Sequence, residues 1–343
     1  MLGYRVRAWG TDPVWEEIPD PTPGPEEVLV DVESCGVGLT VLNCVNGDLA
    51  NDPELLPRVP GHELVGRVTA AGPGAGAELV GRRVVAYFYL VCGACPSCRA
   101  GNDPRCSRLA GWVGVHRDGG YAPQAVLPAL NAIPIAEGID PVAATVIPDA
   151  LATPVHVAGR AAIGPDDRVV VLAAGGGVGI HMVQVAMARG AAVAGLDVVD
   201  TKLAQIESLG AVAVRSDDLA GVDASTLFGG APPTVVVDLL GIPGSMGWSV
   251  ASLGMGGRMV ALTTFRNRTE EIESRELVFR EISVLGSRYA NRAEVAEAAR
   301  LVAGGSIRPI VGEIRGPRDV GEIHDMLRNR TLIGRGALDW RER

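Results

Sequence analysis

The pattern of hydrophobic and polar positions changes near residue 150 of this 343-residue chain. Before that point, short valine-rich runs are separated by proline and glycine, as in residues 27–32, 64–68 and 83–87. Short apolar runs bounded by turn-forming residues are typical of β-strands. The first 150 residues are therefore predicted to form an all-β, barrel-like region.

Beyond residue 150, longer apolar runs alternate with helical stretches. Four of the runs predict strands, and two of the stretches predict helices. The strands are residues 169–172, 192–197, 235–238 and 258–262, and the helices are residues 179–189 and 201–209. Strands that are apolar throughout and alternate with helices form parallel sheets covered on both faces. The sequence therefore predicts an inserted α/β domain over residues 151–285, followed by an amphipathic helix at residues 292–303.

A glycine-rich turn directly follows the first of these strands and opens the first helix. Such a turn lets the backbone come close to a pyrophosphate at a helix N-terminus. Asp197 ends the next strand, where a carboxylate binds the ribose hydroxyls and repels a 2′-phosphate. A flexible loop followed by a surface aspartate does not explain this order, so we predict an NAD site. Its residues are Gly175, Gly176, Gly177, Val178, Gly179 and Asp197.

Four of the six cysteines are clustered. Cys92, Cys95, Cys98 and Cys106 have the spacing C-x2-C-x2-C-x7-C. Four thiolates so spaced close a tetrahedral Zn²⁺ site with no open position, so the zinc would pin a loop and do no chemistry. A [4Fe–4S] cluster uses a related spacing, but its fourth cysteine is normally followed by proline, and here serine follows. We therefore predict a structural zinc within residues 88–110, called the cysteine lobe, with four unpaired thiols as the alternative.

Composition narrows the classes of partner. The chain has 31 basic and 40 acidic residues, and the resulting net charge of −9 argues against nucleic acid or anionic lipid as its main partner. Its longest unbroken apolar run, residues 169–180, is far shorter than the about 18 residues that a membrane span needs. Residues 1–20 lack a signal-peptide pattern. We expect a cytoplasmic protein whose partner is a small molecule.

Five motifs, in order, make nearly the whole chain resemble the zinc-containing medium-chain alcohol dehydrogenase family. They are Cys35-Gly36-Val37-Gly38-Leu39-Thr40-Val41, Gly61-His62-Glu63, the cysteine lobe, Pro148-Asp149-Ala150-Leu151-Ala152-Thr153 and Leu285-Gly286-Ser287. The resemblance implies an α/β plus β-rich fold. A GroES-like β-barrel catalytic domain would cover residues 1–150 and 286–343, and an inserted Rossmann domain, a doubly wound parallel sheet that binds NAD, would cover residues 151–285. It also implies a homodimer or homotetramer.

The resemblance further implies a catalytic zinc site, from which this chain departs. His62 and Asp149 stand at ligand positions, with Glu63 as a neighbour or transient ligand. Zn²⁺ accepts imidazole and carboxylate, and an open coordination position would polarise an alcohol oxygen. The catalytic cysteine of the family falls at Gly38, which has no side chain to bind metal. Thr40 keeps the hydroxyl that relays the substrate proton in the family.

The missing thiolate leaves three accounts of this site open. Zinc binds weakly through His62, Asp149 and Glu63 or water; the site works by positioning without a metal; or it has lost alcohol chemistry. We favour an oxidoreductase whose catalytic zinc is weak or absent, because a two-point chelate binds zinc far more weakly than four thiolates do. Gly38→Cys is accordingly expected to restore metal binding.

Three further site residues follow from the resemblance, and a fourth follows from a predicted helix face. Thr153 would touch the nicotinamide, and Lys202, the only lysine, would lie near the adenosine ribose. Arg335 would reach the pyrophosphate. His156 shares a predicted helix face with Asp149 and Thr153, and is assigned as a proton relay with a packed histidine as the alternative.

The leading hypothesis is an NAD-dependent dehydrogenase that interconverts an alcohol and a carbonyl by hydride transfer, with the proton leaving through Thr40. A zinc-independent reductase of an activated C=C bond is the first alternative, against which the cysteine lobe and Asp197 count. A non-catalytic NAD-binding protein is the second, kept open by Gly38. The residues expected to line the substrate pocket are Val41, Trp112 and Phe265.

Overall fold

The computed structural model describes residues 1–263 and 269–341, which form two compact units. Unit 1 comprises Met1–Ala152, Ala290–Gly305 and Pro309–Arg343, and unit 2 comprises Thr153–Tyr289 and Ser306–Arg308. This division follows the change in hydrophobic pattern near residue 150 and lies close to the expected limits at residues 150 and 286. Unit 2 is thus inserted into the chain of unit 1. Phe265, expected in the substrate pocket, lies outside the described residues.

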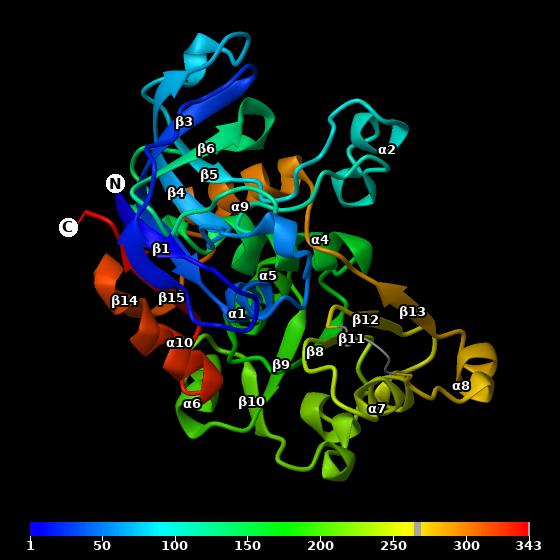
Figure 1. Ribbon diagram of the computed structural model, residues 1–343. Coiled ribbons are helices and arrows are strands. Elements are labelled where there is room, and N and C mark those ends of the chain that lie inside the picture. The colour runs from blue at the N-terminus through cyan, green and yellow to red at the C-terminus, as the bar shows by residue number, and fades with distance from the viewer. Residues whose placement is uncertain (264–268, 342–343) are drawn as a thin grey trace. The chain divides into compact units, whose positions relative to one another are not determined.

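Unit 1 is built on a mixed seven-stranded sheet within the described residues, with the strand order β14-β15-β3-β4-β5-β7 and with β6 paired to β3 (Figure 1). A separate antiparallel pair joins β1 and β2. Buried and half-exposed positions alternate along the first part of β3, so that one face of this strand packs into the core. The strands are β1 (Leu2–Arg5), β2 (Val14–Glu17), β3 (Glu27–Val37), β4 (Glu63–Ala71), β5 (Arg83–Ala86), β6 (Gln124–Pro128), β7 (Ala132–Pro134), β14 (Val311–Arg315) and β15 (Arg335–Asp339).

Short helices fill the connections of unit 1. The α-helices are α1 (Leu39–Val45), α2 (Pro96–Arg99), α3 (Pro141–Ala144), α9 (Arg292–Ala303) and α10 (Val320–Arg328). The 3-10 turns are η1 (Pro53–Leu55), η2 (Ala77–Leu79), η3 (Asp103–Arg105), η4 (Ala129–Asn131) and η8 (Pro317–Asp319). The helix predicted at residues 292–303 is therefore confirmed, and Asn291 caps it with a reciprocal capping box to Glu294.

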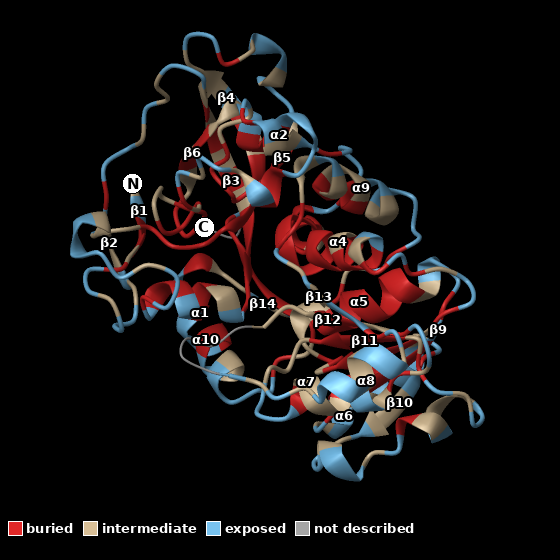
Figure 2. Ribbon diagram, turned by 90° about the vertical axis from the view of Figure 1, so that its right-hand side faces the viewer, coloured by how far each residue is buried: buried red, intermediate tan, exposed pale blue. Residues whose placement is uncertain are grey.

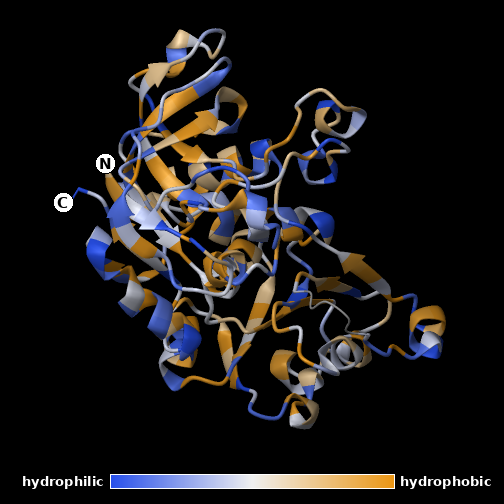
Figure 3. Cartoon of the chain, in the orientation of Figure 1, coloured by the Kyte–Doolittle hydropathy of each residue, from blue (hydrophilic) through white to orange (hydrophobic). Residues whose placement is uncertain are grey.

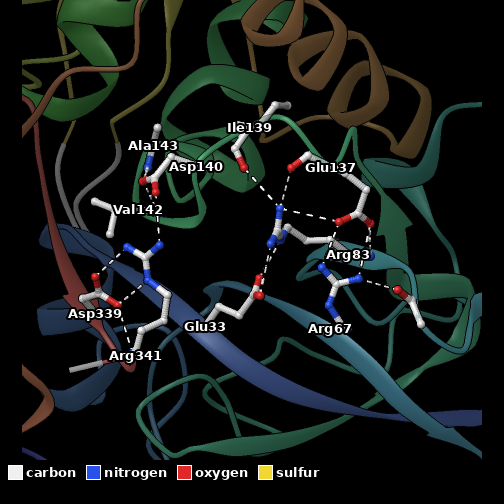
Figure 4. Close-up of polar contacts among 11 residues, drawn as sticks. Glu33, Arg67, Arg83, Glu137, Ile139, Asp140, Val142, Ala143, Asp339 and Arg341 are labelled. Atoms are coloured by element: carbon white, nitrogen blue, oxygen red, sulfur yellow. Dashed lines mark hydrogen bonds and ion pairs between the residues drawn. The ribbon is translucent and has the colours of Figure 1, made fainter. Parts of the chain in front are cut away.

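Arginine side chains tie the rim of this sheet to the loops beside it (Figure 4). Arg83 on β5 binds Glu33 on β3 with a nitrogen–oxygen distance of 2.6 Å and donates to the backbone oxygen of Glu137 at 2.8 Å. Arg67 on β4 reaches the Glu137 carboxylate at 2.8 Å. Each partly exposed pair of this kind contributes at most about 1 kcal/mol. Their role is therefore to fix the register of neighbouring segments, whereas the apolar core supplies most of the stability.

The described residues of unit 2 form a six-stranded parallel sheet, which confirms the predicted doubly wound α/β fold. The strand order is β10-β9-β8-β11-β12-β13. Every residue of β11 is buried, and α5 is largely buried (Figure 2), while the sheet strands are mostly apolar (Figure 3). The strands are β8 (Arg168–Leu172), β9 (Ala192–Asp197), β10 (Val212–Arg215), β11 (Val235–Asp238), β12 (Arg258–Ala261) and β13 (Ser283–Gly286).

The order of the strands in unit 2 indicates which edge of its sheet is expected to bind a ligand. The chain runs outward from β8 to β9 and β10, then crosses back to β11, so the direction of winding reverses between β8 and β11. Ligands of such sheets bind at the carboxyl ends of the strands beside this reversal. The helices are α4 (Ala152–Arg160), α5 (Gly177–Ala188), α6 (Asp200–Ser208), α7 (Ser245–Ser252) and α8 (Ser274–Phe279), with 3-10 turns η6 (Leu219–Gly221) and η7 (Ala224–Phe228).

One helical stretch corrects an expectation from the sequence. An uninterrupted helix from residue 149 was expected, but Asp149 lies in a π-helical turn, η5 (Ile147–Leu151), and α4 begins only at Ala152. The i, i+4 face predicted for Asp149 and Thr153 is therefore broken by the wider turn. Residues Pro141–Arg160 together are long and apolar enough to cross a membrane by length and composition, but 83% of their most apolar window is buried, as in a core helix.

Candidate active site and metal centres

The four thiols of the cysteine lobe converge. Their sulfur atoms are separated by 3.5 Å between Cys95 and Cys98, 3.6 Å between Cys92 and Cys106, and 3.9 Å between Cys95 and Cys106. A Zn–S bond of about 2.3 Å gives a tetrahedron whose sulfur–sulfur edge is about 3.8 Å. The four donors therefore fit one tetrahedral Zn²⁺ ion.

A buried ion pair anchors the cysteine lobe to helix α9. Asp103, in the turn η3 of the lobe, is 2% exposed. Its carboxylate accepts hydrogen bonds from the Arg292 side chain at 3.0 and 3.2 Å and from the Arg292 backbone N–H at 3.1 Å. Arg292 is the first residue of α9, so this ion pair attaches the lobe to the N-terminus of that helix.

A second group of ligand-type side chains meets in unit 1. His62 and Glu63 lie where β4 begins, and Asp149 lies in the π-helical turn. Ligand atoms of the three residues lie within 4.8 Å of one another, and all three residues are buried. His62 Nε2 is 3.4 Å from Asp149 Oδ2. The backbone turn into this motif needs Gly61, because its φ is +95° and a Cβ would meet the Tyr121 ring at 2.5 Å.

Arg335 completes this group, which we call the acidic cluster: His62, Glu63, Asp149 and Arg335. Arg335 begins β15 and is 4% exposed. Its Nε lies 3.0 and 3.1 Å from the two Glu63 carboxylate oxygens, and its Nη2 lies 2.9 Å from Glu63 Oε1 and 2.8 Å from Asp149 Oδ2. The guanidinium thus bridges both carboxylates. The coenzyme pyrophosphate role expected for Arg335 stays a prediction, and the structure shows the side chain engaged elsewhere.

The Arg335 guanidinium fills the room beside Gly38. A Cβ built on Gly38 would overlap Nη1 and Cζ of Arg335 and would lie 2.9 Å from its Nε. Gly38 is also the residue at which the resemblance expects a cysteine ligand. Both carboxylates of the acidic cluster are held by a cation, and the fourth donor position is filled by an arginine. These residues therefore do not fit a catalytic Zn²⁺ ion as they stand.

Burial governs the protonation of the neighbouring groups. Burial raises the pKa of the Glu63 carboxyl, and the charge of Arg335 opposes that shift. Burial lowers the pKa of Arg335, but the charges of Glu63 and Asp149 outweigh this effect and raise it above its usual value. Burial also raises the pKa of Cys44 to about 12 and that of Cys35 well above its usual value. Both thiols are therefore neutral core groups at physiological pH.

The predicted catalytic residues Thr40 and His156 lie on α1 and α4, and α4 also carries Thr153, the predicted nicotinamide contact. Thr40 is half-buried near the start of α1, and Val41 beside it is fully buried. Thr153 and His156 lie on α4, with Thr153 buried and His156 half-buried. Trp112, expected in the substrate pocket, is half-buried and packs edge-on against Tyr89. Their catalytic roles stay predictions.

The predicted coenzyme residues of unit 2 meet at the carboxyl ends of β8 and β9. Asp197 is held by backbone donors: Oδ2 accepts from the Gly175 N–H at 2.9 Å, and Oδ1 accepts from the Val198 N–H at 2.8 Å. A Cβ on Gly175 would overlap the buried Lys202 side chain. Gly176 is the N-cap of α5, and within the described residues no side chain caps this helix by a hydrogen bond. The binding of a dinucleotide pyrophosphate at this helix N-terminus stays a prediction.

Sequence reasoning missed the pairing of Arg335 with Glu63 and Asp149. One signal was present, because loss of the side chain at Gly38 leaves room that another group must fill. That signal does not say which residue fills it. Arg335 lies 297 positions further along the chain, and only the pairing of β15 with β3 brings it to Gly38.

Comparisons with known proteins agree with this architecture. Residues 24–137 match the alcohol dehydrogenase GroES-like domain, and residues 177–304 match the zinc-binding dehydrogenase domain. The chain is 31% identical to an L-galactonate-5-dehydrogenase of Escherichia coli K12 (86% of this chain, 85% of that one) and 28% identical to an acryloyl-coenzyme A reductase of Metallosphaera sedula (98% and 96%). A crystal structure of an NAD-dependent alcohol dehydrogenase superposes with a TM-score of 0.88 at 29% identity and covers 99% of both chains.

Proposed function

The chain belongs to the zinc-containing medium-chain alcohol dehydrogenase family, and on that premise we propose that it transfers hydride from NADH to a C=C bond conjugated with a carbonyl group, without a catalytic zinc ion. As a member of this family it is an alcohol-dehydrogenase-like oxidoreductase that uses a nicotinamide coenzyme. What remains to be assigned is the bond that receives the hydride.

The observation that carries the proposal is the guanidinium of Arg335 beside Gly38. Addition of hydride to a simple ketone places a full negative charge on one oxygen, which in this family a zinc ion stabilises. Here the single arginine cation is already paired with two carboxylates. A cation neutralised in this way gives an alkoxide little electrostatic support.

A conjugated C=C bond makes a smaller demand on the site. The nicotinamide coenzyme, held by the Asp197 and glycine-turn residues of unit 2, would supply the hydride for a new C–H bond at the β-carbon and would leave as NAD⁺. The π pair would move toward the carbonyl, and a proton from solvent would later add to the α-carbon. The negative charge is spread over the enolate, so a hydrogen-bond donor suffices where an alkoxide needs a metal. The acryloyl-coenzyme A reductase relative, similar over 98% of this chain, supports this substrate class.

Interconversion of an alcohol and a carbonyl is the second candidate. Thr40 keeps the relay hydroxyl, and His62 keeps the imidazole of the family motif. The L-galactonate-5-dehydrogenase relative, whose name describes oxidation of a carbinol, also supports it. Such a substrate would need its own activation, such as a carbinol next to a conjugating group.

NAD is proposed as the coenzyme in preference to NADP. The Asp197 carboxylate is fixed at the end of β9 by the N–H groups of Gly175 and Val198. A 2′-phosphate would meet this negative charge at the ribose. Thr153 and Lys202 are assigned to the nicotinamide and ribose ends of the same coenzyme.

One structural zinc is proposed in the cysteine lobe, because the sulfur separations fit a tetrahedron. We further propose a cytoplasmic homodimer or homotetramer, as expected from the family.

A paired substrate panel tests the function. Purified protein is given NADH with an α,β-unsaturated thioester or ketone, with its saturated carbonyl counterpart, and, in reverse, NAD with the matching alcohols. We expect NADH to be oxidised in the presence of the unsaturated substrates. Mass spectrometry of the product should show that two hydrogens have been added across the C=C bond. Treatment with a chelator should leave the rate of NADH oxidation unchanged. Turnover confined to saturated ketones and alcohols would contradict the proposal.

A further inference from the structure

We infer that Arg335 takes the place of the catalytic metal in this chain: its guanidinium excludes zinc from the acidic cluster, and its Nη1 donates a hydrogen bond to the carbonyl oxygen of the substrate. The second half of this inference rests on the proposed function. The first half concerns only the residues of unit 1 and stands independently of the substrate.

The position of the guanidinium supports the exclusion. The side chain that would bring a thiolate to a metal has no room at Gly38, because Arg335 Nη1 and Cζ already occupy the space of its Cβ. The same guanidinium holds Glu63 through Nε and Nη2, and Asp149 through Nη2, so it engages the two anionic donors that a metal would need. A divalent ion would have to displace a paired cation from a buried site.

The hydrogen-bond pattern supports a donor role. Within the described residues, Nε and Nη2 make all the hydrogen bonds of the Arg335 side chain, and Nη1 makes none. Nη1 is also the nitrogen nearest to the Gly38 Cβ position, on the segment that leads into Thr40. Guanidinium N–H groups bind anionic oxygens well and keep their protons, so Nη1 would stabilise an enolate oxygen without proton transfer.

The two carboxylates then have a positioning role. Glu63 is fully buried and receives three contacts from Arg335 at 2.9–3.1 Å, which fixes the plane of the guanidinium. Asp149 fixes its other edge. The guanidinium plane can lie beside residue 38 only because glycine has no Cβ. The position of the Arg335 side chain therefore depends on Gly38.

Zinc content tests the exclusion. Wild type, Gly38→Cys, and Gly38→Cys combined with Arg335→Ala are purified with excess zinc, and metal per chain is measured by mass spectrometry. A Cβ at position 38 displaces the guanidinium, but the displaced cation still pairs with Glu63 and Asp149. Contrary to the expectation from the sequence, we therefore expect the same zinc content in wild type and Gly38→Cys. The double variant should bind one further equivalent, which is lost on His62→Ala. A further equivalent in Gly38→Cys alone would overturn the exclusion, and so would a double variant that folds and takes up none.

Substitution of glycine by alanine tests the donor role. Gly38→Ala forces the guanidinium to move, and we expect kcat/KM for the conjugated substrate to fall about 100-fold, the loss typical of one oxyanion donor. Gly321→Ala is the matched control in the same unit, because its Cβ would meet nothing within 4 Å. Equal activity of the two variants, with unchanged melting temperatures, would overturn the donor role.

Rescue of kcat by added guanidinium provides a further test of the donor role of Arg335. Arg335→Ala leaves two buried carboxylates without a cation, so its fold is first checked by circular dichroism. Millimolar guanidinium chloride should then raise kcat several-fold, and potassium chloride at equal ionic strength should not. Equal effects of the two salts would contradict the donor role. If wild type reduces no conjugated substrate, the proposed function fails, while the zinc contents still decide the exclusion.

Discussion

The cysteine lobe and the acidic cluster both bring ligand atoms within 4.8 Å of one another, yet their charges are balanced in opposite ways. Neighbouring thiols of the lobe lie at sulfur separations of 3.5–3.9 Å, which suit a divalent cation held by all four thiolates. In the acidic cluster the cation belongs to the chain, because Arg335 binds both carboxylates. Proximity of ligand atoms alone therefore does not distinguish a metal site from an ion-pair site.

The lobe should show the largest effect of a single substitution. Cys98→Ser removes one of four thiolates, and we expect loss of the bound zinc with a destabilisation of about 3 kcal/mol or more. Metal content and urea unfolding measure the two effects. Cys44→Ser is the matched control, because Cys44 is also buried but lies outside the lobe, and it should keep its zinc. Loss of zinc from both variants would contradict the assignment of the bound zinc to the cysteine lobe alone.

We expect His324, which lies outside the acidic cluster, to make the protein sensitive to acid. His324 is buried against Tyr121, with Nε2 3.1 Å from the hydroxyl, and burial lowers its pKa to about 4. Because this value is below that of the unfolded chain, stability is lost as pH falls from about 6.5 toward 4, by about 2 kcal/mol between pH 7 and 5. Urea unfolding at both pH values should show this slope, and His324→Gln should abolish it. If the free energy of unfolding of the variant still fell by the same amount between pH 7 and 5, a group other than His324 would be responsible for the acid sensitivity.

Asp197 offers a third arrangement of negative charge, in which backbone N–H groups hold the carboxylate. We propose that this carboxylate recognises the coenzyme ribose. Asp197→Ser should narrow the preference for NADH over NADPH by about tenfold, or about 1.4 kcal/mol. Fluorescence titration of both coenzymes measures it. Tighter binding of NADPH than NADH by the unmodified protein would show that the carboxylate does not select the coenzyme.

Much of the fold could be predicted from the sequence, because it depends on local patterns. The strand at residues 192–197 and the helix at residues 292–303 have the predicted limits, since apolar runs and capping residues are read along the chain. The π-helical turn at Asp149 could not be predicted, because its residues also suit an α-helix. The acidic cluster could be predicted only in part. His62, Glu63 and Asp149 belong to motifs, whereas the pairing of Arg335 depends on a strand register across the whole chain.

The zinc content of the unmodified protein tests the central claim most directly. Protein produced with excess zinc is desalted, and metal per chain is measured by mass spectrometry before and after modification of the accessible thiols. We predict one zinc per chain, released when the lobe thiols are modified and retained in His62→Ala. Two tightly bound zinc ions per chain, the second lost in His62→Ala, would contradict it.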